Sequence, residues 1–326
     1  MVSAAVTPDF IVIGDGLIGL STALELSHHA KVYVAGRLCQ GMASTAAAGL
    51  LIPALERLPV AARPFYADSL ARFPVLVDTL NEFDPGLKLL PGLIDRSGGG
   101  EVVREADGAI DNVRLLAALR AAVSAAPSVT VIDDFVSRIE PDGDALSIRT
   151  RGGRRASARR VVLAAGAWSA SIGGLPRPLP VRPLKGQMIA LGATVLSRAM
   201  MGDDVYLVPR GDETLVGATV EEAGFDITVS AAGVATLRAS AIALCPELAD
   251  APITRSWAGI RPATPDMLPI LGPDPESPAL IYACGHSKNG VLLTPATSVA
   301  VAALCLDRPT PTPVDPFSIM RFFPDE

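Results

Sequence analysis

The first regular pattern in the chain is an unbroken apolar run, Phe10–Ile13, which is typical of a strand buried on both faces. Apolar residues then recur at helical spacing, which predicts a helix over residues 17–29. A second apolar run predicts another strand at residues 31–35. Strand, turn, helix and strand in this order predict that the chain opens with a parallel α/β unit.

The later apolar segments alternate between helical and strand periodicity. Helical spacing occurs at residues 65–83, 112–123, 234–244 and 297–306. Short apolar or alternating runs predict strands at residues 129–132, 135–139, 146–150, 161–163, 187–191, 205–208, 214–218 and 280–283. Residues 91–108 hold a run of three glycines at positions 98–100, and we expect a flexible connection there.

This order of elements predicts two domains, both made from separate pieces of the chain. Prolines at positions 176, 178, 180 and 183 mark the expected crossing between them. We expect an α/β, Rossmann-like nucleotide-binding domain that is assembled from residues 1–75, 109–177 and 257–326. Residues 76–108 and 178–256 are expected to form a β-rich substrate domain, an antiparallel sheet with helices.

Composition narrows the class of protein. Apolar residues make up 49% of the 326 residues, which favours a folded core, and the net charge of −6 gives no basic surface for nucleic acid. The four cysteines lack C-x-x-C spacing and there are three histidines, so we expect no metal site and a reducing, cytoplasmic location. The first cation is Lys31, so no secretory signal is expected.

One uncharged stretch of near-spanning length occurs at residues 289–306. It contains Pro295 and several hydroxyl side chains, and it opens on a turn that bears glycine. These residues favour a buried helix near the C-terminus over a membrane span.

Glycines dominate the first turn. Gly14, Gly16 and Gly19 form the pattern G-x-G-x-x-G between the first expected strand and the first expected helix. Glycine is needed where the turn is tight, where backbone approaches a pyrophosphate, and where the helix packs on the strand. The sequence therefore predicts a dinucleotide site with its phosphates at the helix N-terminus.

The usual ribose-binding acid is missing from this pattern. An Asp or Glu is expected about 20 residues after the glycines, but the position holds Gly36, and no acid occurs between Glu25 and Glu56. Arg37 follows, and an Arg at this corner can accept the 2′-phosphate of NADP. Local chemistry by itself therefore favours NADP.

Further motifs recur along nearly the whole chain. They are S-T-A-L-E-L at residues 21–26, A-S-T-A-A-A-G-L-L-I-P at 43–53, L-K-G-Q at 184–187, V-Y-L-V-P-R at 205–210, W-A-G-I-R-P-A-T-P-D at 257–266 and G-H-S-K-N-G at 285–290. In these motifs the chain resembles the D-amino-acid-oxidase-like flavoproteins, and within them the glycine oxidases. In that family Arg commonly follows the ribose-binding acid, so Arg37 also fits FAD, which we favour.

The resemblance implies FAD bound without a covalent link, because the family's covalent attachment context is not recognisable around Cys284. It also implies a set of cofactor contacts. These are Gly14, Asp15, Gly16, Leu17, Ile18, Gly19, Arg37, Ser44, Thr45, Ala47, Ala48, Gly49, Leu50, Val136, Ala165, Gly166, Trp168, Asn289, Gly290, Val291 and Leu292.

The resemblance also implies a reaction and its residues. Arg261 matches the Arg that clamps the substrate carboxylate, and Tyr206 matches an active-site Tyr. Lys288 falls where glycine oxidases place a second Arg, and Asp204 lies two residues before Tyr206. The implied reaction is oxidation of glycine or an N-substituted glycine, with hydride passing from the α-carbon to flavin N5. The imine would hydrolyse to glyoxylate and amine, and O2 would reoxidise the flavin to give H2O2. We interpret His286 as a hydrogen-bonded loop residue.

Departures from the family pattern leave alternatives open. Lys288 replaces an Arg, and residues 91–108 look shorter than in the family, with sequence between Asp95 and Asp111 largely missing. Gly36 predicts weak FAD binding, which Gly36→Glu is expected to tighten. The alternatives are a flavin dehydrogenase of another amino acid or amine, an NADP-linked enzyme, and a catalytically degraded FAD-binding subunit. The expected partners are a small amino-acid or amine substrate and O2, with a possible homo-oligomer but no nucleic acid or membrane.

Overall fold

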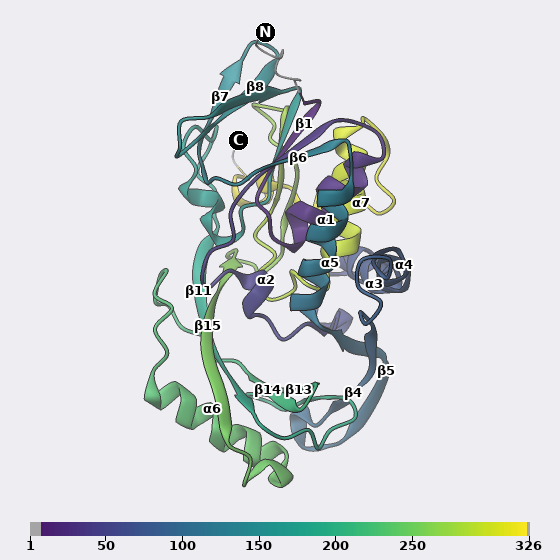
Figure 1. The fold of residues 1–326 in the computed structure, drawn as a ribbon, viewed down its shortest axis with the longest axis vertical. Helices are drawn as coiled ribbons and strands as arrows, with labels where there is room; N and C mark the ends of the chain where they lie inside the picture. The colour runs from purple at the N-terminus through teal and green to yellow at the C-terminus, as the bar shows by residue number, and fades with distance from the viewer. Residues whose placement is uncertain (1–7, 325–326) are drawn as a thin grey trace.

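The structure, a computed structural model, describes residues 8–324. A six-stranded and an eight-stranded sheet lie in opposite halves of an elongated molecule, and a long pair of strands runs between the halves (Figure 1). The six-stranded sheet has the order β16 (Ile270–Pro273), β17 (Leu280–Cys284), β10 (Arg160–Leu163), β1 (Phe10–Ile13), β2 (Val32–Ala35) and β6 (Val129–Ile132).

The six-stranded sheet is parallel from β17 to β6, and β16 pairs antiparallel with β17 at one edge. Helices pack on one of its faces, which Figure 1 shows with α1, α5 and α7 side by side. The helices of this layer are α1 (Leu17–Ser27), α3 (Arg63–Ala71), α4 (Phe73–Leu80), α5 (Asn112–Ala125) and α7 (Thr294–Cys305). Parallel strands joined by helices confirm the predicted Rossmann-like α/β class.

A small antiparallel sheet covers the other face. It consists of β7 (Val136–Asp142), β8 (Ala145–Thr150) and β9 (Arg155–Ala158). Phe10 and Val12 of β1 pack into the helical core, whereas Ile11 and Ile13 pack against the small sheet. Because both faces of β1 are covered, all four of its residues are apolar and buried.

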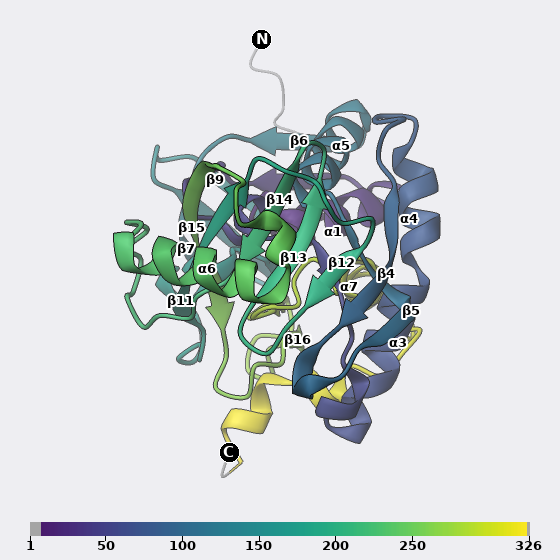
Figure 2. The same cartoon turned by 90° about the horizontal axis from the view of Figure 1, so that it is seen from below.

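The eight-stranded sheet is antiparallel except where β12 pairs with β4. Its order is β15 (Ile253–Ala263), β11 (Arg182–Leu191), β14 (Glu213–Gly217), β13 (Tyr206–Arg210), β12 (Ala199–Met201), β4 (Leu89–Asp95), β5 (Val102–Ile110) and β3 (Leu50–Leu51). Helix α6 (Ala231–Leu244) covers the outer face of this sheet (Figure 2). Short α2 (Ala43–Ala46) packs beside β15, between the two halves. The domain boundaries themselves stay a prediction.

Two expectations about local structure are wrong. Residues 91–108 are not a flexible connection, because β4 and β5 pair there as a hairpin in the eight-stranded sheet. Gly98 and Gly99 adopt positive φ angles of 77° and 81° at its tip, which explains why glycines gather there. The helix expected at residues 65–83 is two helices, because Pro74 lies in the first turn of a new helix after Arg72.

The uncharged stretch at residues 289–306 forms a loop and the 12-residue helix α7, which is buried against α1 and α3. In the described part of the chain, no helix combines the length and apolar composition needed to cross a membrane. The structure therefore agrees with the predicted buried helix.

A buried ion pair joins Arg177 to Asp274, which is also hydrogen-bonded to Tyr282 of β17. Asp274 is fully buried and accepts from Arg177 Nε at 3.2 Å and from the Tyr282 hydroxyl at 2.9 Å. Its other oxygen accepts the backbone N–H groups of Glu276 and Ser277. Every acceptor site of this carboxylate is thus used inside the protein.

We expect Asp274→Ala to lower the free energy of unfolding by about 3 kcal/mol, because it removes the fully buried carboxylate that Arg177 and Tyr282 share, while the second acid on Arg177, Glu276, is 62% exposed. Glu105→Ala is the matched control, since Glu105 pairs with Arg198 at the surface with 70% of its side chain exposed, and we expect a change below about 1 kcal/mol. Urea unfolding of the three proteins measures both values. Equal losses in the two variants would contradict this account.

Candidate functional site

One cavity of about 1110 Å³ connects the N-terminus of α1 with the inner face of the eight-stranded sheet. Residues from both halves line it, including the glycine turn, α2 with the residues after it, the end of β15 and the loop before α7. Its size exceeds that of a typical pocket for a single drug-sized ligand. The cavity therefore has room for an extended cofactor together with a small substrate.

The glycine turn has the form that a pyrophosphate site requires. Gly14 has a φ of +116°, and a Cβ placed on it would lie 2.3 Å from the carbonyl oxygen of Ala164. A Cβ on Gly19 would lie 1.9 Å from the carbonyl oxygen of Gly14. The first N–H of α1, on Leu17, donates to Ser44 Oγ at 3.1 Å. Helix N–H groups and a hydroxyl therefore meet at one end of the cavity, as an anionic diphosphate needs.

The segment around α2 forms a wall of small side chains held by hydrogen bonds. Trp257 Nε1 donates to the carbonyl oxygen of Ala46 at 2.9 Å, and Asn112 Nδ2 donates to that of Ser44 at 2.9 Å. Arg210 Nη2 donates to the carbonyl oxygen of Ala48 at 2.8 Å. Because the side chains of the α2 segment itself are short, a planar ring system can approach its backbone along this wall.

Most of the cofactor contacts that the sequence predicts lie on this cavity. Those that line it are Gly14, Asp15, Gly16, Leu17, Ile18, Arg37, Ser44, Ala47, Ala48, Gly49, Leu50, Val136, Ala165, Gly166, Trp168, Asn289, Gly290 and Val291. Three others do not. Gly19 is packed against Gly14, Thr45 is exposed with its hydroxyl donating to the Met42 carbonyl, and Leu292 is buried in the helical core.

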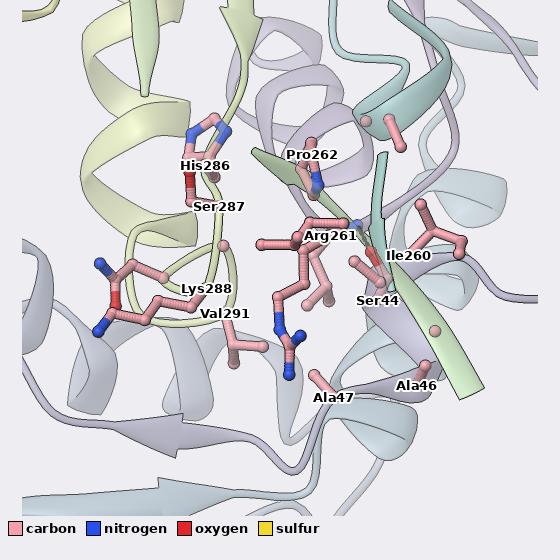
Figure 3. Close-up of a pocket in the computed structure, with 18 of the residues that line it drawn as sticks. Ser44, Ala46, Ala47, Ile260, Arg261, Pro262, His286, Ser287, Lys288 and Val291 are labelled. Atoms are coloured by element: carbon pink, nitrogen blue, oxygen red, sulfur yellow. Dashed lines mark hydrogen bonds between the residues drawn. The ribbon is translucent and has the colours of Figure 1, made fainter. Parts of the chain in front are cut away.

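Arg261, near the end of β15, extends its guanidinium into the cavity toward Ala47 (Figure 3). Nη1 donates to the carbonyl oxygens of Thr219 at 3.1 Å and Lys185 at 3.3 Å, which fixes the group. A Cβ on Gly186 would lie 2.4 Å from Nη1. The glycine of the L-K-G-Q motif therefore makes room for Arg261, a function that the sequence did not reveal.

Tyr206, on β13, lies near Arg261 and faces the same space. A Cβ on Gly217 would lie 2.5 Å from its hydroxyl oxygen, so a second strand glycine makes room for this ring. Burial raises the pKa of Tyr206, and the nearby Arg261 guanidinium opposes that shift in part. The phenol therefore keeps its proton at neutral pH and can donate a hydrogen bond.

Lys288 and Asp204 also line the cavity, and neither makes an ion pair with any residue in the range 8–324. Lys288 extends away from Arg261 in Figure 3. The structure thus keeps Arg261 and Tyr206 together, and the Lys288 side chain points away from Arg261.

Two other groups that the sequence singled out are electrically neutral. His286 is buried, its ring Nε2 lies 3.0 Å from Thr297 Oγ1, and burial lowers its pKa to about 3. This confirms the hydrogen-bonded loop histidine. Burial raises the pKa of the Cys284 thiol to about 12. The four cysteines are free thiols, and between residues 8 and 324 no group of His, Cys, Asp and Glu side chains is arranged to hold a metal.

At the far end of the cavity, residue 36 has little room for a side chain. A Cβ on Gly36 would lie 2.8 Å from the backbone nitrogen of Asp15 and 3.1 Å from its Cβ. This contact argues against the expectation that Gly36→Glu tightens FAD binding, because the glycine turn itself would have to move. Arg37 forms a solvent-exposed pair with Asp133 at 3.0 Å beside this corner.

Comparison with known proteins identifies the family. The model of the FAD dependent oxidoreductase family matches residues 9–93 and 78–304. The bifunctional protein ThiO/ThiG of Nostoc sp. (strain PCC 7120) is 32% identical over 93% of this chain and 53% of its own length. The chain therefore spans about half the length of this relative. Glycine oxidase of Geobacillus kaustophilus (strain HTA426) is 31% identical over 96% of this chain and 97% of its own length.

Solved structures agree with the sequence comparison. The crystal structure of glycine oxidase from Geobacillus kaustophilus superposes with a TM-score of 0.88 at 31% identity, covering 97% of this chain and 99% of that one. Iminodiacetate oxidase from Chelativorans sp. BNC1 gives a TM-score of 0.84 at 25% identity, over 95% and 98% of the two chains. The chain belongs to the family of FAD-dependent oxidoreductases, and its cofactor is non-covalent FAD. The NADP interpretation of Arg37 is wrong.

The neutral, buried His286 predicts how stability depends on pH. Unfolding returns this imidazole to its ordinary pKa of 6.5, so between about pH 6.5 and 3 the unfolded chain binds a proton that the folded chain does not. The free energy of unfolding therefore falls as the pH falls through that window.

The free energy of unfolding should fall in both proteins as the pH is lowered from 7 to 5. We expect this fall to be about 2 kcal/mol smaller in His286→Gln than in the unmodified protein. Glutamine keeps a polar partner for Thr297 and has no proton to gain. Urea unfolding of both proteins at the two pH values measures the difference. The same loss in both would show that His286 does not cause it.

Proposed function

We propose that this protein catalyses the oxidative deamination of glycine or of an N-substituted glycine. The overall reaction converts the amine, O2 and water into glyoxylate, the released amine and H2O2, which balances atoms and electrons. The observation that carries the proposal is the pairing of Arg261 with Tyr206 at the substrate end of a cavity whose other end fits FAD.

Arg261 is suited to bind the substrate carboxylate. A guanidinium presents two parallel N–H groups to a carboxylate and remains charged in a buried site. Its position is fixed by the carbonyl groups of Thr219 and Lys185, so little side-chain entropy is lost on binding. Tyr206, which holds its proton, donates a second hydrogen bond to the same carboxylate.

This anchoring orients the rest of the substrate. With its carboxylate held at Arg261, the α-carbon is directed toward the wall of small residues at Ala47, where the flavin ring would lie. Bound FAD would supply the redox chemistry there, as the acceptor of the α-carbon hydride and the donor of two electrons to O2. The surrounding apolar side chains of Met188, Met201 and Val291 limit water around the reacting carbon.

Lys288 and Asp204 are proposed to contact the substituent on the substrate nitrogen. Both line the cavity without an ion-pair partner among the described residues, so their charges are available to a ligand. Iminodiacetate, the substrate in the name of one structural neighbour, is a glycine with a second carboxylate on nitrogen. A cationic Lys288 suits such a group better than it suits glycine itself.

Two alternatives to the proposed oxidase each predict a distinct result. A flavin dehydrogenase would use the same carboxylate site but would reoxidise slowly in air. A catalytically degraded FAD-binding subunit is disfavoured by the retained Arg261 and Tyr206 and by the glycines that make room for both. A cytoplasmic location and a homo-oligomer stay predictions.

We expect anaerobic glycine, sarcosine or iminodiacetate to bleach the flavin absorbance of the purified protein, and admission of air to restore it. Glyoxylate should accumulate in proportion to the substrate consumed. Flavin reduction without glyoxylate would overturn the proposed substrate class. A flavin that no amine or amino acid reduces would instead support the degraded subunit, and reduction without recovery in air would support the dehydrogenase.

We expect Arg261→Lys to lower kcat/KM for sarcosine by about 100-fold, because a single ammonium cannot replace a bidentate guanidinium. The ratio of kcat/KM for sarcosine to that for dimethylamine, which has no carboxylate, should also fall in Arg261→Lys. Arg255→Lys is the matched control on the same strand, since Arg255 is 52% exposed, pairs with Glu213 at 2.8 Å and does not line the cavity. Steady-state oxygen consumption measures all three proteins, and an unchanged preference in Arg261→Lys would contradict this role.

A further inference from the structure

Asp15, the residue between the first two glycines of the turn, is an unusual charged group. It is 5% exposed, and it lies on the cavity wall beside Gly36. Its Oδ2 accepts a hydrogen bond from Arg120 Nη1 at 2.6 Å. Its Oδ1 has no hydrogen-bond partner among the residues that the structure describes. Asp15 Oδ1 is not among the fully buried oxygens that lack a partner, so it keeps exposed surface on the cavity wall, where a ligand hydroxyl can reach it.

The free oxygen of Asp15 lies where a side chain of residue 36 would begin. A Cβ built on Gly36 would be 3.2 Å from Asp15 Oδ1 and 3.1 Å from Asp15 Cβ. An acidic side chain at the end of β2 is what normally reaches the ribose in a G-x-G-x-x-G site. Here the Asp15 side chain lies beside that strand end, and the Asp15 backbone nitrogen would be closer still to a Cβ at residue 36, at 2.8 Å, so glycine fits both.

The other acids near residue 36 have hydrogen-bond or ion-pair partners at the protein surface. Asp133 is 72% exposed and paired with Arg37. Asp134 accepts the backbone N–H groups of Phe135 and Gly152 in a surface turn. Asp15 is therefore the carboxylate that both lines the cavity and adjoins residue 36.

Arg120 makes an acid tolerable in the glycine turn. A carboxylate beside the N-terminus of α1 would repel the diphosphate that binds there, because both are negative. Arg120, on α5, pairs with Asp15 and offsets its charge, and it also orients the carboxylate with Oδ1 left over. The pair thus keeps an acceptor oxygen at the cavity without adding net negative charge next to the phosphates.

We propose that Asp15 binds the adenosine ribose of FAD, accepting a hydrogen bond from a ribose hydroxyl at Oδ1, in place of the acid that residue 36 lacks. Gly36 and Asp15 form one coupled arrangement, in which the glycine makes the room and the aspartate supplies the oxygen. The inference rests on FAD as the cofactor and goes beyond the proposed substrate, so either can fail without the other.

The test measures the affinity of apoprotein for FAD and for FAD analogues whose adenosine ribose is 2′-deoxy or 3′-deoxy, by quenching of flavin fluorescence. We expect Asp15→Ala to weaken FAD binding about 10- to 100-fold. The unmodified protein should lose a comparable factor on at least one deoxy analogue, and Asp15→Ala should lose little further on it. Asp133→Ala, the matched control, should bind FAD nearly as the unmodified protein does and should still discriminate against the analogue.

Two results would overturn the inference. One is FAD binding by Asp15→Ala that equals that of the unmodified protein. The other is an equal loss of affinity for FAD and for both analogues, which would mean that Asp15 supports the turn and does not contact the ribose. Thermal unfolding of each apoprotein shows whether a variant is folded, and Asp15→Asn, which keeps the shape and the Arg120 contact, serves if Asp15→Ala is not.

Exchanging the two residues gives an independent test. We expect Gly36→Glu to bind FAD more weakly than the unmodified protein, because the new side chain meets Asp15. Asp15→Gly removes the side-chain part of the obstruction and the acid, while the backbone nitrogen of residue 15 stays 2.8 Å from the Cβ position of residue 36. Adding Gly36→Glu to that variant should therefore weaken FAD binding less than Gly36→Glu does in the unmodified protein. If Gly36→Glu improves binding with Asp15 in place, or worsens it equally in both backgrounds, the coupling between the two positions is absent.

Discussion

The pairing of β11 with β15 is the constraint on which the rest of the architecture depends. The two strands stay in antiparallel register from Arg182 opposite Ala263 to Ala190 opposite Arg255, where the register shifts, and they run from one half of the molecule to the other (Figure 1). β15 carries Arg261, which lines the cavity, and also Trp257, which donates a hydrogen bond to the carbonyl oxygen of Ala46 in α2. A slip of one residue would turn both side chains to the opposite face. One ladder therefore sets the distance between the cofactor end and the substrate end.

Several titratable groups on the cavity carry no charge at neutral pH. His286, Tyr206 and Cys284 are kept neutral by burial, which lowers the pKa of the imidazole and raises that of the phenol and the thiol. Arg261 is a charged group of this cavity whose position is fixed, because the carbonyl groups of Thr219 and Lys185 hold its guanidinium beside the neutral Tyr206. A pre-positioned guanidinium attracts a carboxylate more strongly in such a partly desolvated site than it would in water. Recognition of an amino acid by its carboxylate then leaves the nitrogen and its substituent free to vary.

The corner at Asp15 and Gly36 shows how a departure from a family pattern is accommodated. In the sequence, Gly36 stands where the ribose-binding acid is expected, and it therefore predicts weak binding of the ribose. In space it is the opening that admits the Asp15 side chain, and the partner of that side chain, Arg120, comes from a helix far along the sequence. A substitution at either position therefore changes what the other tolerates.

The sequence by itself determined the α/β class, the glycine turn and the family, and most of the site residues that it predicted do line the cavity, because periodicity and short motifs depend on neighbours in the chain. It misjudged residues 91–108, where glycines at a hairpin tip resemble those of a flexible linker. Only the tertiary structure assigned Gly186 and Gly217 to the space around Arg261 and Tyr206, excluded Gly19, Thr45 and Leu292 from the cavity, and brought Arg120 to Asp15. These are contacts between distant segments, whose partners no local pattern specifies.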